Sequence, residues 1–217
     1  MKNEIMLKTK RLLLTPMPME KLEQKVQNDP DPEMRKAYGE MLALCKEKPE
    51  EFLWAIPWEM LLKKDRQPVG DLCFKGAPQK GTVELGYGID KAYEGQGLTT
   101  EAVGAMLDWA FAKDNVYAVE AETAPENIAS QKILAHHKFV PQGEGEEGPR
   151  FRREKPKTNW MTVYMCFGIS IGMALGSLMG NISIGMCYGV AAGVLLGSAM
   201  DASEKKRRAE ILGEEKK

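Results

Sequence analysis

The chain has 217 residues, enough for one domain of ordinary size and an appendage, because compact domains cluster at about 100 to 150 residues. Its 30 Lys and Arg residues nearly balance its 31 Asp and Glu residues, which argues against a nucleic-acid-binding surface. The cysteines form no CxxC pair and have no histidine at metal-ligand spacing, so we expect reduced thiols and no metal ion.

The charged residues divide the chain into two regions. They recur every few positions up to Lys157, whereas residues 158–200 contain no Asp, Glu, Lys or Arg. We therefore predict a first domain over residues 1–155, a linker over 156–158, an apolar helical hairpin over 159–200 and a charged cytoplasmic tail over 201–217. Within residues 1–8, a charged residue returns before any apolar stretch reaches the length of a signal peptide. We therefore expect the first domain to lie in the cytoplasm.

Hydrophobic patterns in the first domain predict an α/β fold. In chain order, the predicted strands cover residues 11–15, 58–62, 69–74, 82–89 and 116–123, and the predicted helices cover 19–27, 32–45, 97–113 and 127–139. The three middle strands are separated by short turns, which requires antiparallel pairing. The helix over 97–113 lies between two strands, so these two strands are expected to run parallel. Residues 149–152 can close the sheet.

A glycine-rich turn, Gly95-Gln96-Gly97-Leu98-Thr99-Thr100, connects the strand over 82–89 with the following helix. Its two glycines let backbone N–H groups face an anion without an intervening Cβ, and the helix N-terminus adds partial positive charge. A pyrophosphate fits such a turn. The alternative is a plain glycine-rich connection between a strand and a helix.

A second constellation lies in the helix that begins at Asn127 and includes Ala129, Ser130, Leu134 and, at its end, Phe139. Together with Leu85-Gly86-Tyr87 and the glycine turn, in this order, it resembles the GNAT superfamily of N-acetyltransferases over about residues 8–155. Within that superfamily, the chain is similar to the branch that acetylates the N-termini of ribosomal proteins. The resemblance implies a mixed, mostly antiparallel sheet with a splayed central parallel pair and helices on both sides.

The resemblance also implies acetyl-CoA as the cosubstrate, with its pantetheine arm in the splay and its pyrophosphate on the glycine turn. The cofactor-binding residues that it implies are Tyr87, Gly88, Ile89, Gly95, Gln96, Gly97, Leu98, Thr99, Thr100, Asn127 and Lys132. Glu84 is the predicted base for the acceptor amine, with Glu120 and Glu122 as alternatives. Ser130 is expected near the leaving thiolate, and backbone N–H groups of residues 87–89 are expected to hold the thioester carbonyl.

Four positions depart from the family pattern. Glu94 stands where Gln, Arg or a bulky residue is usual, Thr99 replaces Gly or Ala, and Lys138 replaces Gly. Leu134 stands where many relatives have a proton-donating tyrosine, so tyrosine chemistry at position 134 is excluded.

Several other side chains have structural interpretations. His136 and His137 lie at a helix end, where cations suit the helix dipole, so we interpret them as structural. Asn127 is explained by helix capping as well as by pantetheine binding. Trp54, Trp58 and Met60 either line the acceptor cleft or pack in the core.

The apolar region resembles the glycine-zipper helix pairs found at the ends of many bacterial proteins. Its glycines recur every four residues, at 168, 172, 176 and 180 and at 185, 189, 193 and 197. Such faces let helix backbones touch in membranes. A single helix over 158–200 would be about 64 Å long, twice a bilayer core, so we predict a transmembrane hairpin that breaks near Gly180.

Basic residues flank both ends of the predicted hairpin, which places both ends, and the first domain, on the cytoplasmic face of a membrane. In one alternative, residues 160–167 form the last strand of the sheet. In another, the hairpin is a soluble helix pair that mediates homo-oligomerisation, and the protein is cytoplasmic.

The predicted function is transfer of acetyl from acetyl-CoA to a primary amine, of a protein N-terminus or a small molecule, by direct attack. The expected partners are this amine acceptor and a membrane, through residues 159–200, but no nucleic acid. The alternative function is a catalytically weak, membrane-tethered acyl-CoA-binding or sensory domain.

Overall fold

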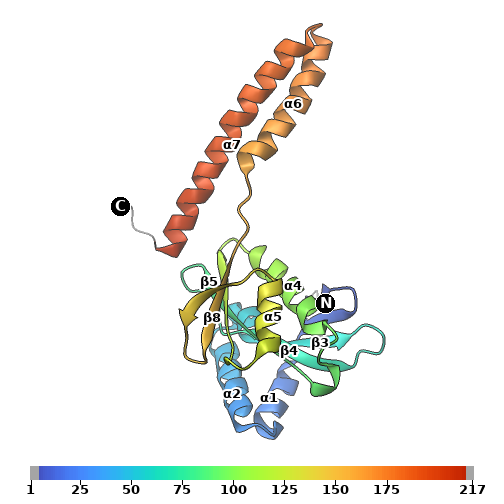
Figure 1. Ribbon diagram of the computed structural model, residues 1–217, viewed down its shortest axis with the longest axis vertical. Helices are drawn as coiled ribbons and strands as arrows, with labels where there is room; N and C mark the ends of the chain where they lie inside the picture. Colours follow the sequence, from blue (N-terminus) through green and yellow to red (C-terminus); the bar gives the residue numbers. More distant parts are fainter. Residues whose placement is uncertain (1–4, 214–217) are drawn as a thin grey trace. The chain divides into compact units, whose positions relative to one another are not determined.

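The computed structural model describes residues 5–213, which divide into two compact units, one up to Lys155 and one from Pro156 onward (Figure 1). Residues 1–4 of the predicted cytoplasmic start and residues 214–217 of the predicted charged tail lie outside the described range.

An eight-stranded sheet lies at the centre of the first unit, in the order β1-β2-β3-β4-β5-β6-β8-β7. The strands are β1 (Leu7–Lys8), β2 (Leu12–Pro16), β3 (Trp58–Leu62), β4 (Pro68–Phe74), β5 (Thr82–Ile89), β6 (Ala118–Glu122), β7 (Val140–Glu144) and β8 (Pro149–Glu154). The neighbouring pairs are antiparallel, with the exception of β5 and β6, which run parallel. The predicted mixed, mostly antiparallel sheet with a central parallel pair is confirmed.

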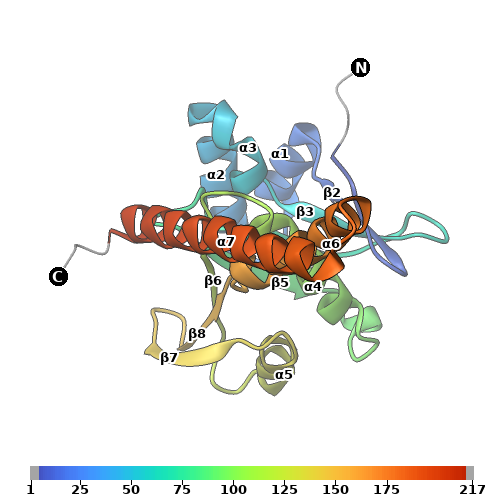
Figure 2. The ribbon, with the colours of Figure 1, turned by 90° about the horizontal axis from the view of Figure 1, so that it is seen from above.

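Helices cover both faces of this sheet (Figure 2). One face carries α1 (Met19–Asn28), α2 (Pro32–Glu47), the 3₁₀ turn η1 (Pro49–Glu51) and α3 (Phe52–Ala55), and the other carries α4 (Leu98–Phe111) and α5 (Ile128–His136). The turn η2 (Lys91–Tyr93) leads from β5 to α4. Side chains alternate along β5, so Val83 and Leu85 enter the main core with α4, whereas Glu84 points to the opposite face.

The core explains why these segments form these elements. Trp58 and Met60 on β3 are completely buried, and Trp54 lies against Phe74 and Trp109 with ring centroids 5.1 and 4.6 Å apart. Trp58 and Met60 therefore pack in the core, and Trp54 is a partly buried residue that packs against it. β1, α3 and β7 lack a counterpart among the predicted elements. β1 and α3 have only two and four residues, and β7 contains Pro141 and Gly143 and has no apolar alternation.

The second unit is a helical hairpin of α6 (Trp160–Leu178) and α7 (Ile182–Leu212). The alternative in which residues 160–167 close the sheet is wrong, because these residues begin α6 and β8 occupies the strand position beside β6. α7 continues to Leu212, so residues 201–212 of the predicted tail are helical.

Glycines form the contact between the two hairpin helices. A Cβ atom added to Gly172 would lie 2.3 Å from the carbonyl oxygen of Gly185, and one added to Gly189 would lie 2.0 Å from that of Gly168. The outward surface is apolar instead, since Phe167, Tyr188 and Leu195 are 63%, 75% and 70% exposed. The hairpin thus buries its smallest residues and exposes large apolar ones, the reverse of a soluble helix pair.

Replacing both Gly172 and Gly189 by Leu should separate the two helices, because side chains would have to occupy space that the facing backbone fills. We expect each change to destabilise the hairpin by about 1–3 kcal/mol, as overpacking does in protein cores. Thermal unfolding of the full chain in detergent, followed by circular dichroism, measures this effect. Ala191→Leu is the control because Ala191 is exposed. Equal melting of the two proteins would contradict the glycine contact.

Candidate functional site

The parallel strands β5 and β6 separate in the middle of the sheet. Their pairing register covers Thr82, Val83 and Glu84 of β5 and ends where Glu84 faces Glu120. β5 nevertheless continues along β4 as far as Ile89, which faces Gly70. The β6-facing edge of β5 from Leu85 onward is therefore free of strand pairing, as the predicted splay requires, and its backbone groups can bind a ligand.

The glycine turn follows this open edge. Gly95 and Gly97 adopt left-handed conformations with φ of 70° and 71°, and Gly97 is the N-cap of α4. Because Gly97 has no side chain to cap the helix, the first N–H groups of α4 remain for a ligand. Leu98 and Thr99 are buried and fix the turn to the core, whereas Gln96 is exposed.

A cluster from the beginning of the chain supports this turn. The Glu101 carboxylate accepts hydrogen bonds from the backbone N–H of Arg11 (2.6 Å), from Arg11 Nε (2.8 Å) and from the Thr9 hydroxyl. Arg11 Nη1 also donates to the backbone oxygen of Gln96 at 2.9 Å. Burial alone would raise the pKa of Glu101, but the hydrogen bonds from Thr9 and Arg11 lower it to about 2.

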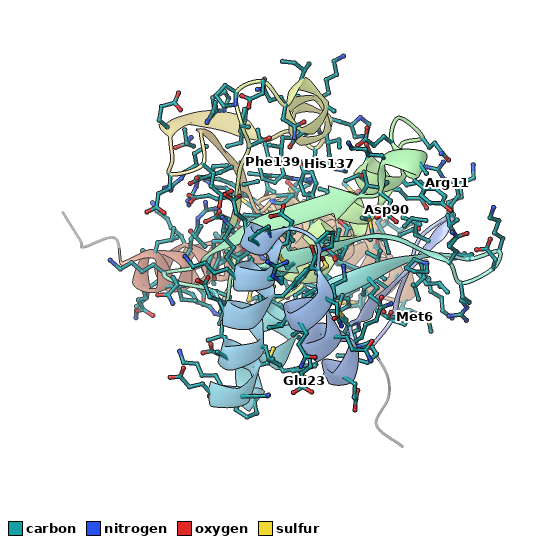
Figure 3. The ribbon with its side chains drawn as sticks, turned by 90° about the horizontal axis from the view of Figure 1, so that it is seen from below. Met6, Arg11, Glu23, Asp90, His137 and Phe139 are labelled. Atoms are coloured by element: carbon teal, nitrogen blue, oxygen red, sulfur yellow. The ribbon has the colours of Figure 1, made fainter. Side chains whose placement is uncertain are left out.

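Arg11, which Figure 3 labels, thus holds the glycine turn although it lies far from it in the sequence. Sequence reasoning missed both Arg11 and Glu101. The signals available were a Thr-x-Arg sequence before the first long strand and a glutamate in the first turn of α4.

Tyr87 and Ser130 meet across the open edge. Their hydroxyl oxygens lie 2.9 Å apart, with Tyr87 on β5 and Ser130 in the first turn of α5. Burial raises the pKa of Tyr87, although its hydrogen bond with Ser130 lowers it in part, so the phenol stays protonated at neutral pH. Position 134 carries no tyrosine, but Tyr87 brings a phenol to Ser130 from another element. This was not foreseen from the sequence.

The three predicted base candidates differ in their ion-pair partners. Glu84 pairs with Lys75 at 2.6 Å, Glu120 pairs with Arg152, and Glu122 pairs with Arg150. Glu122 is also fixed by the backbone N–H of Glu147 at 2.9 Å, and this hydrogen bond, with the neighbouring Arg150, lowers its pKa. Glu122 is therefore a poor base.

Glu84 instead pairs with a lysine. The lysine ammonium group resembles that of a protonated primary amine substrate. Lys75 also lines a cavity of about 590 Å³ between α2, the β4–β5 turn and Glu147. The other charged side chains that line it are Glu40, Glu47 and Glu147, so the cavity suits a cation.

The remaining predicted site residues lie around the turn and α5. The Asn127 carboxamide oxygen caps α5 by accepting from Ser130 N at 2.9 Å, and Lys132 is exposed. His137 Nε2 lies 2.7 Å from the backbone oxygen of Thr100 and links α5 to α4, in keeping with a structural role. Lys138 has φ of 60°, a left-handed conformation that glycine adopts more readily than lysine.

The chain matches the family model "Acetyltransferase (GNAT) domain" over residues 11–140, more than half of its length. The chain therefore belongs to the GNAT acetyltransferase domain family, as its motifs predicted. It is 30% identical over 109 residues to an uncharacterized N-acetyltransferase from Bacillus licheniformis. These aligned residues cover 50% of this chain and 58% of that protein. A probable N-acetyltransferase from Bacillus subtilis (strain 168) is 38% identical over 69 residues, 32% of this chain and 37% of that protein.

Solved structures share the fold at low sequence identity. Ribosomal-protein-S5-alanine acetyltransferase from Vibrio fischeri superposes with a TM-score of 0.55 at 17% identity and covers 71% of this chain and 98% of its own. RimJ from Mycobacterium smegmatis, in complex with CoA-disulfide, superposes with a TM-score of 0.51 at 20% identity, over 70% of this chain and 88% of its own.

Gly97→Asp should abolish CoA binding, because it forces a side chain into a left-handed position and adds negative charge to the glycine turn. Isothermal titration calorimetry with CoA measures the affinity. Gly143→Asp is the matched control: Gly143 also has positive φ, 96°, with open space around it, and lies on β7. Unchanged CoA affinity in the Gly97 variant would show that the glycine turn does not bind CoA.

Proposed function

We propose that this chain is an acetyl-CoA-dependent N-acetyltransferase that transfers acetyl to a primary amine by direct attack. The observation that carries the proposal is the end of β5–β6 pairing at Glu84, next to the open edge that leads to the glycine turn. A slot with unpaired backbone groups suits the pantetheine amides, and the glycine turn suits the diphosphate. Family membership and a CoA-bound structural neighbour support this assignment.

Glu84 is the proposed base. It lies at the point where the two strands separate, and it pairs with Lys75, which lines the cavity next to α2. The Lys75 ammonium occupies a position that a substrate ammonium can take over. The carboxylate, directly or through water, then removes a proton and leaves the neutral amine that attacks.

Tyr87 and Ser130 are proposed to complete the transfer. The amine nitrogen attacks the thioester carbonyl carbon, the carbon–sulfur bond breaks, the nitrogen gives up its extra proton as the amide forms, and the CoA thiolate takes up a proton. The Tyr87 phenol remains protonated, and its hydrogen bond with Ser130 keeps the two hydroxyl groups together. Backbone N–H groups of residues 87–89 are proposed to stabilise the developing oxyanion.

The acceptor is proposed to be a cationic amine, of a protein N-terminus or a small molecule. Three glutamates line the cavity beside Lys75, and they favour an ammonium group. The structural neighbours include a ribosomal-protein-alanine acetyltransferase, which supports the N-terminal alternative.

Glu84→Gln should lower turnover about 100-fold at neutral pH and much less at high pH, where the amine is already unprotonated. Steady-state CoA release between pH 6.5 and 9.5, measured with a panel of amines and N-terminal peptides, gives the profile. Glu120→Gln, which changes the residue facing Glu84 across the strands, should retain the normal pH dependence. An equal loss at all pH values for the Glu84 variant would assign the base elsewhere. CoA binding without any turnover would favour the acyl-CoA-binding or sensory alternative.

We further propose that the hairpin spans a membrane and tethers the enzyme to its cytoplasmic face. Both helices are long and apolar enough to cross a bilayer, and their exposed surfaces are apolar. The basic residues that flank the hairpin are Arg150, Arg152, Arg153, Lys155 and Lys157 on one side and residues 205–208 on the other. Both flanks belong on the cytoplasmic side.

A chain that ends at Lys157 should be soluble and bind acetyl-CoA, because the sheet and the glycine turn lie before Lys155. The full chain should sediment with membranes and require detergent. Ultracentrifugation of cell extracts, with calorimetry on the truncated chain, tests both statements. A full chain that stays in the supernatant without detergent would contradict membrane insertion and leave homo-oligomerisation as the role of the hairpin.

A further inference from the structure

Lys75 lies directly across the sheet from the proposed base. Its backbone N–H donates to the backbone oxygen of Glu84 at 2.9 Å, and the next pair along, Phe74 and Leu85, belongs to the β4–β5 register. Lys75 and Glu84 are therefore cross-strand neighbours whose side chains leave the sheet on the same side. Because β5 pairs with β6 only as far as Glu84, this lysine stands beside the beginning of the open edge.

The Lys75 ammonium is held between two carboxylates. Its nitrogen lies 2.6 Å from Glu84 and 2.7 Å from Glu147, which belongs to the turn between β7 and β8. Burial alone would lower the pKa of Lys75, but its hydrogen bonds to Glu147 and Glu84 raise it above the ordinary value for lysine. Lys75 is therefore an ammonium at neutral pH, and it needs a base before it can act as a nucleophile.

Glycines keep the surface of β5 clear beyond this pair. Side chains alternate along a strand, so the positions that follow Glu84 on the same face are Gly86 and Gly88. A Cβ atom added to Gly88 would have no atom within 4 Å, and one added to Gly86 would lie 3.5 Å from Cys73 Sγ. Since a strand rises about 3.4 Å per residue, the flexible four-carbon stem of a lysine can reach roughly two residues along this face.

We propose that Lys75 is a self-acetylation site, whose Nζ takes the acetyl group from acetyl-CoA bound to the same chain when no acceptor amine is present. The inference rests on the proposed function, since it uses Glu84 as the base and a thioester along residues 85–89. The ammonium of Lys75 already has the contact with this base that an external amine would need. Holding nucleophile and base on one chain also removes the need to collect them from solution.

The proposed reaction moves two protons. Glu84 takes one proton from the Lys75 ammonium and passes it to water, and the neutral nitrogen attacks the thioester carbonyl carbon. The carbon–sulfur bond then breaks, the nitrogen loses its second proton as the amide forms, and the CoA thiolate takes up one proton. The products are acetyl-lysine and CoA. The amide is uncharged, so Glu84 and Glu147 lose the cation that lies between them.

The test is incubation of the full chain in detergent with acetyl-CoA and no added amine, followed over time by peptide mass spectrometry. Lys75 should gain one acetyl group about 100-fold faster than Lys36 or Lys64, the low end of what general-base catalysis contributes. Uncatalysed acetylation would give the opposite order. The side chains of Lys36 and Lys64 are 81% and 74% exposed, against 42% for Lys75, whose raised pKa also disfavours the neutral amine.

A matched pair of variants separates the base from the ion pair. Glu84→Gln should slow acetylation of Lys75 about 100-fold, because the base is lost. Glu147→Gln also removes one of the two carboxylates but keeps the base, so Lys75 should be acetylated at least as fast as in the unaltered chain. Calorimetry with CoA establishes that each variant is folded and binds the cofactor. Equal slowing in both variants, or no slowing in the Glu84 variant, would overturn the proposal.

The remaining outcomes distinguish this proposal from the proposed function. Release of CoA with an added amine, without acetyl-lysine at residue 75 in the amine-free reaction, would overturn self-acetylation and leave the acetyltransferase assignment intact. A chain that binds acetyl-CoA but acetylates neither Lys75 nor any amine would overturn both. At saturating acetyl-CoA, the rate constant for Lys75 should not change when the chain is diluted. A rate constant proportional to chain concentration would show transfer between chains and overturn the internal route.

Discussion

The end of hydrogen bonding between β5 and β6 at Glu84 and Glu120 is the constraint on which the candidate site depends. Up to this pair, the strands form an ordinary parallel ladder whose backbone groups satisfy one another. Beyond it, β5 is held by β4 alone and presents its other edge. The unpaired backbone groups along this edge are available to hydrogen-bond an extended ligand or water.

Side chains around this opening belong to separate segments that the fold brings together. Tyr87 reaches Ser130 from the opposite side of the opening, and Lys75 reaches Glu84 from the adjacent β4–β5 turn. Arg11 and Glu101 join the first strands to the first turn of α4 and hold the glycine turn in shape. The site therefore depends on contacts across the first unit, and substitutions in the N-terminal strands should alter the conformation of the glycine turn.

The hairpin follows a different physical rule. In the first unit, large apolar side chains such as Trp58 and Leu85 are buried, and most charged side chains are exposed or partly exposed. In the hairpin, Gly172 and Gly193 are buried and residues such as Tyr188 are exposed. Close backbone contact can hold helices together where the surroundings are as apolar as the side chains, which is the situation in a bilayer.

The sequence by itself determined the elements with strong local signals. The middle strands, the glycine turn before α4 and the glycine repeats of the hairpin are all visible in short windows, because side-chain periodicity and glycine conformation act locally. Only the tertiary structure decided which groups meet. The hydrogen bond between Arg11 and Glu101 joins residues 90 positions apart, and the Tyr87–Ser130 contact joins residues 43 apart. No local pattern encodes such contacts, because they depend on the strand order and on where β5 and β6 separate.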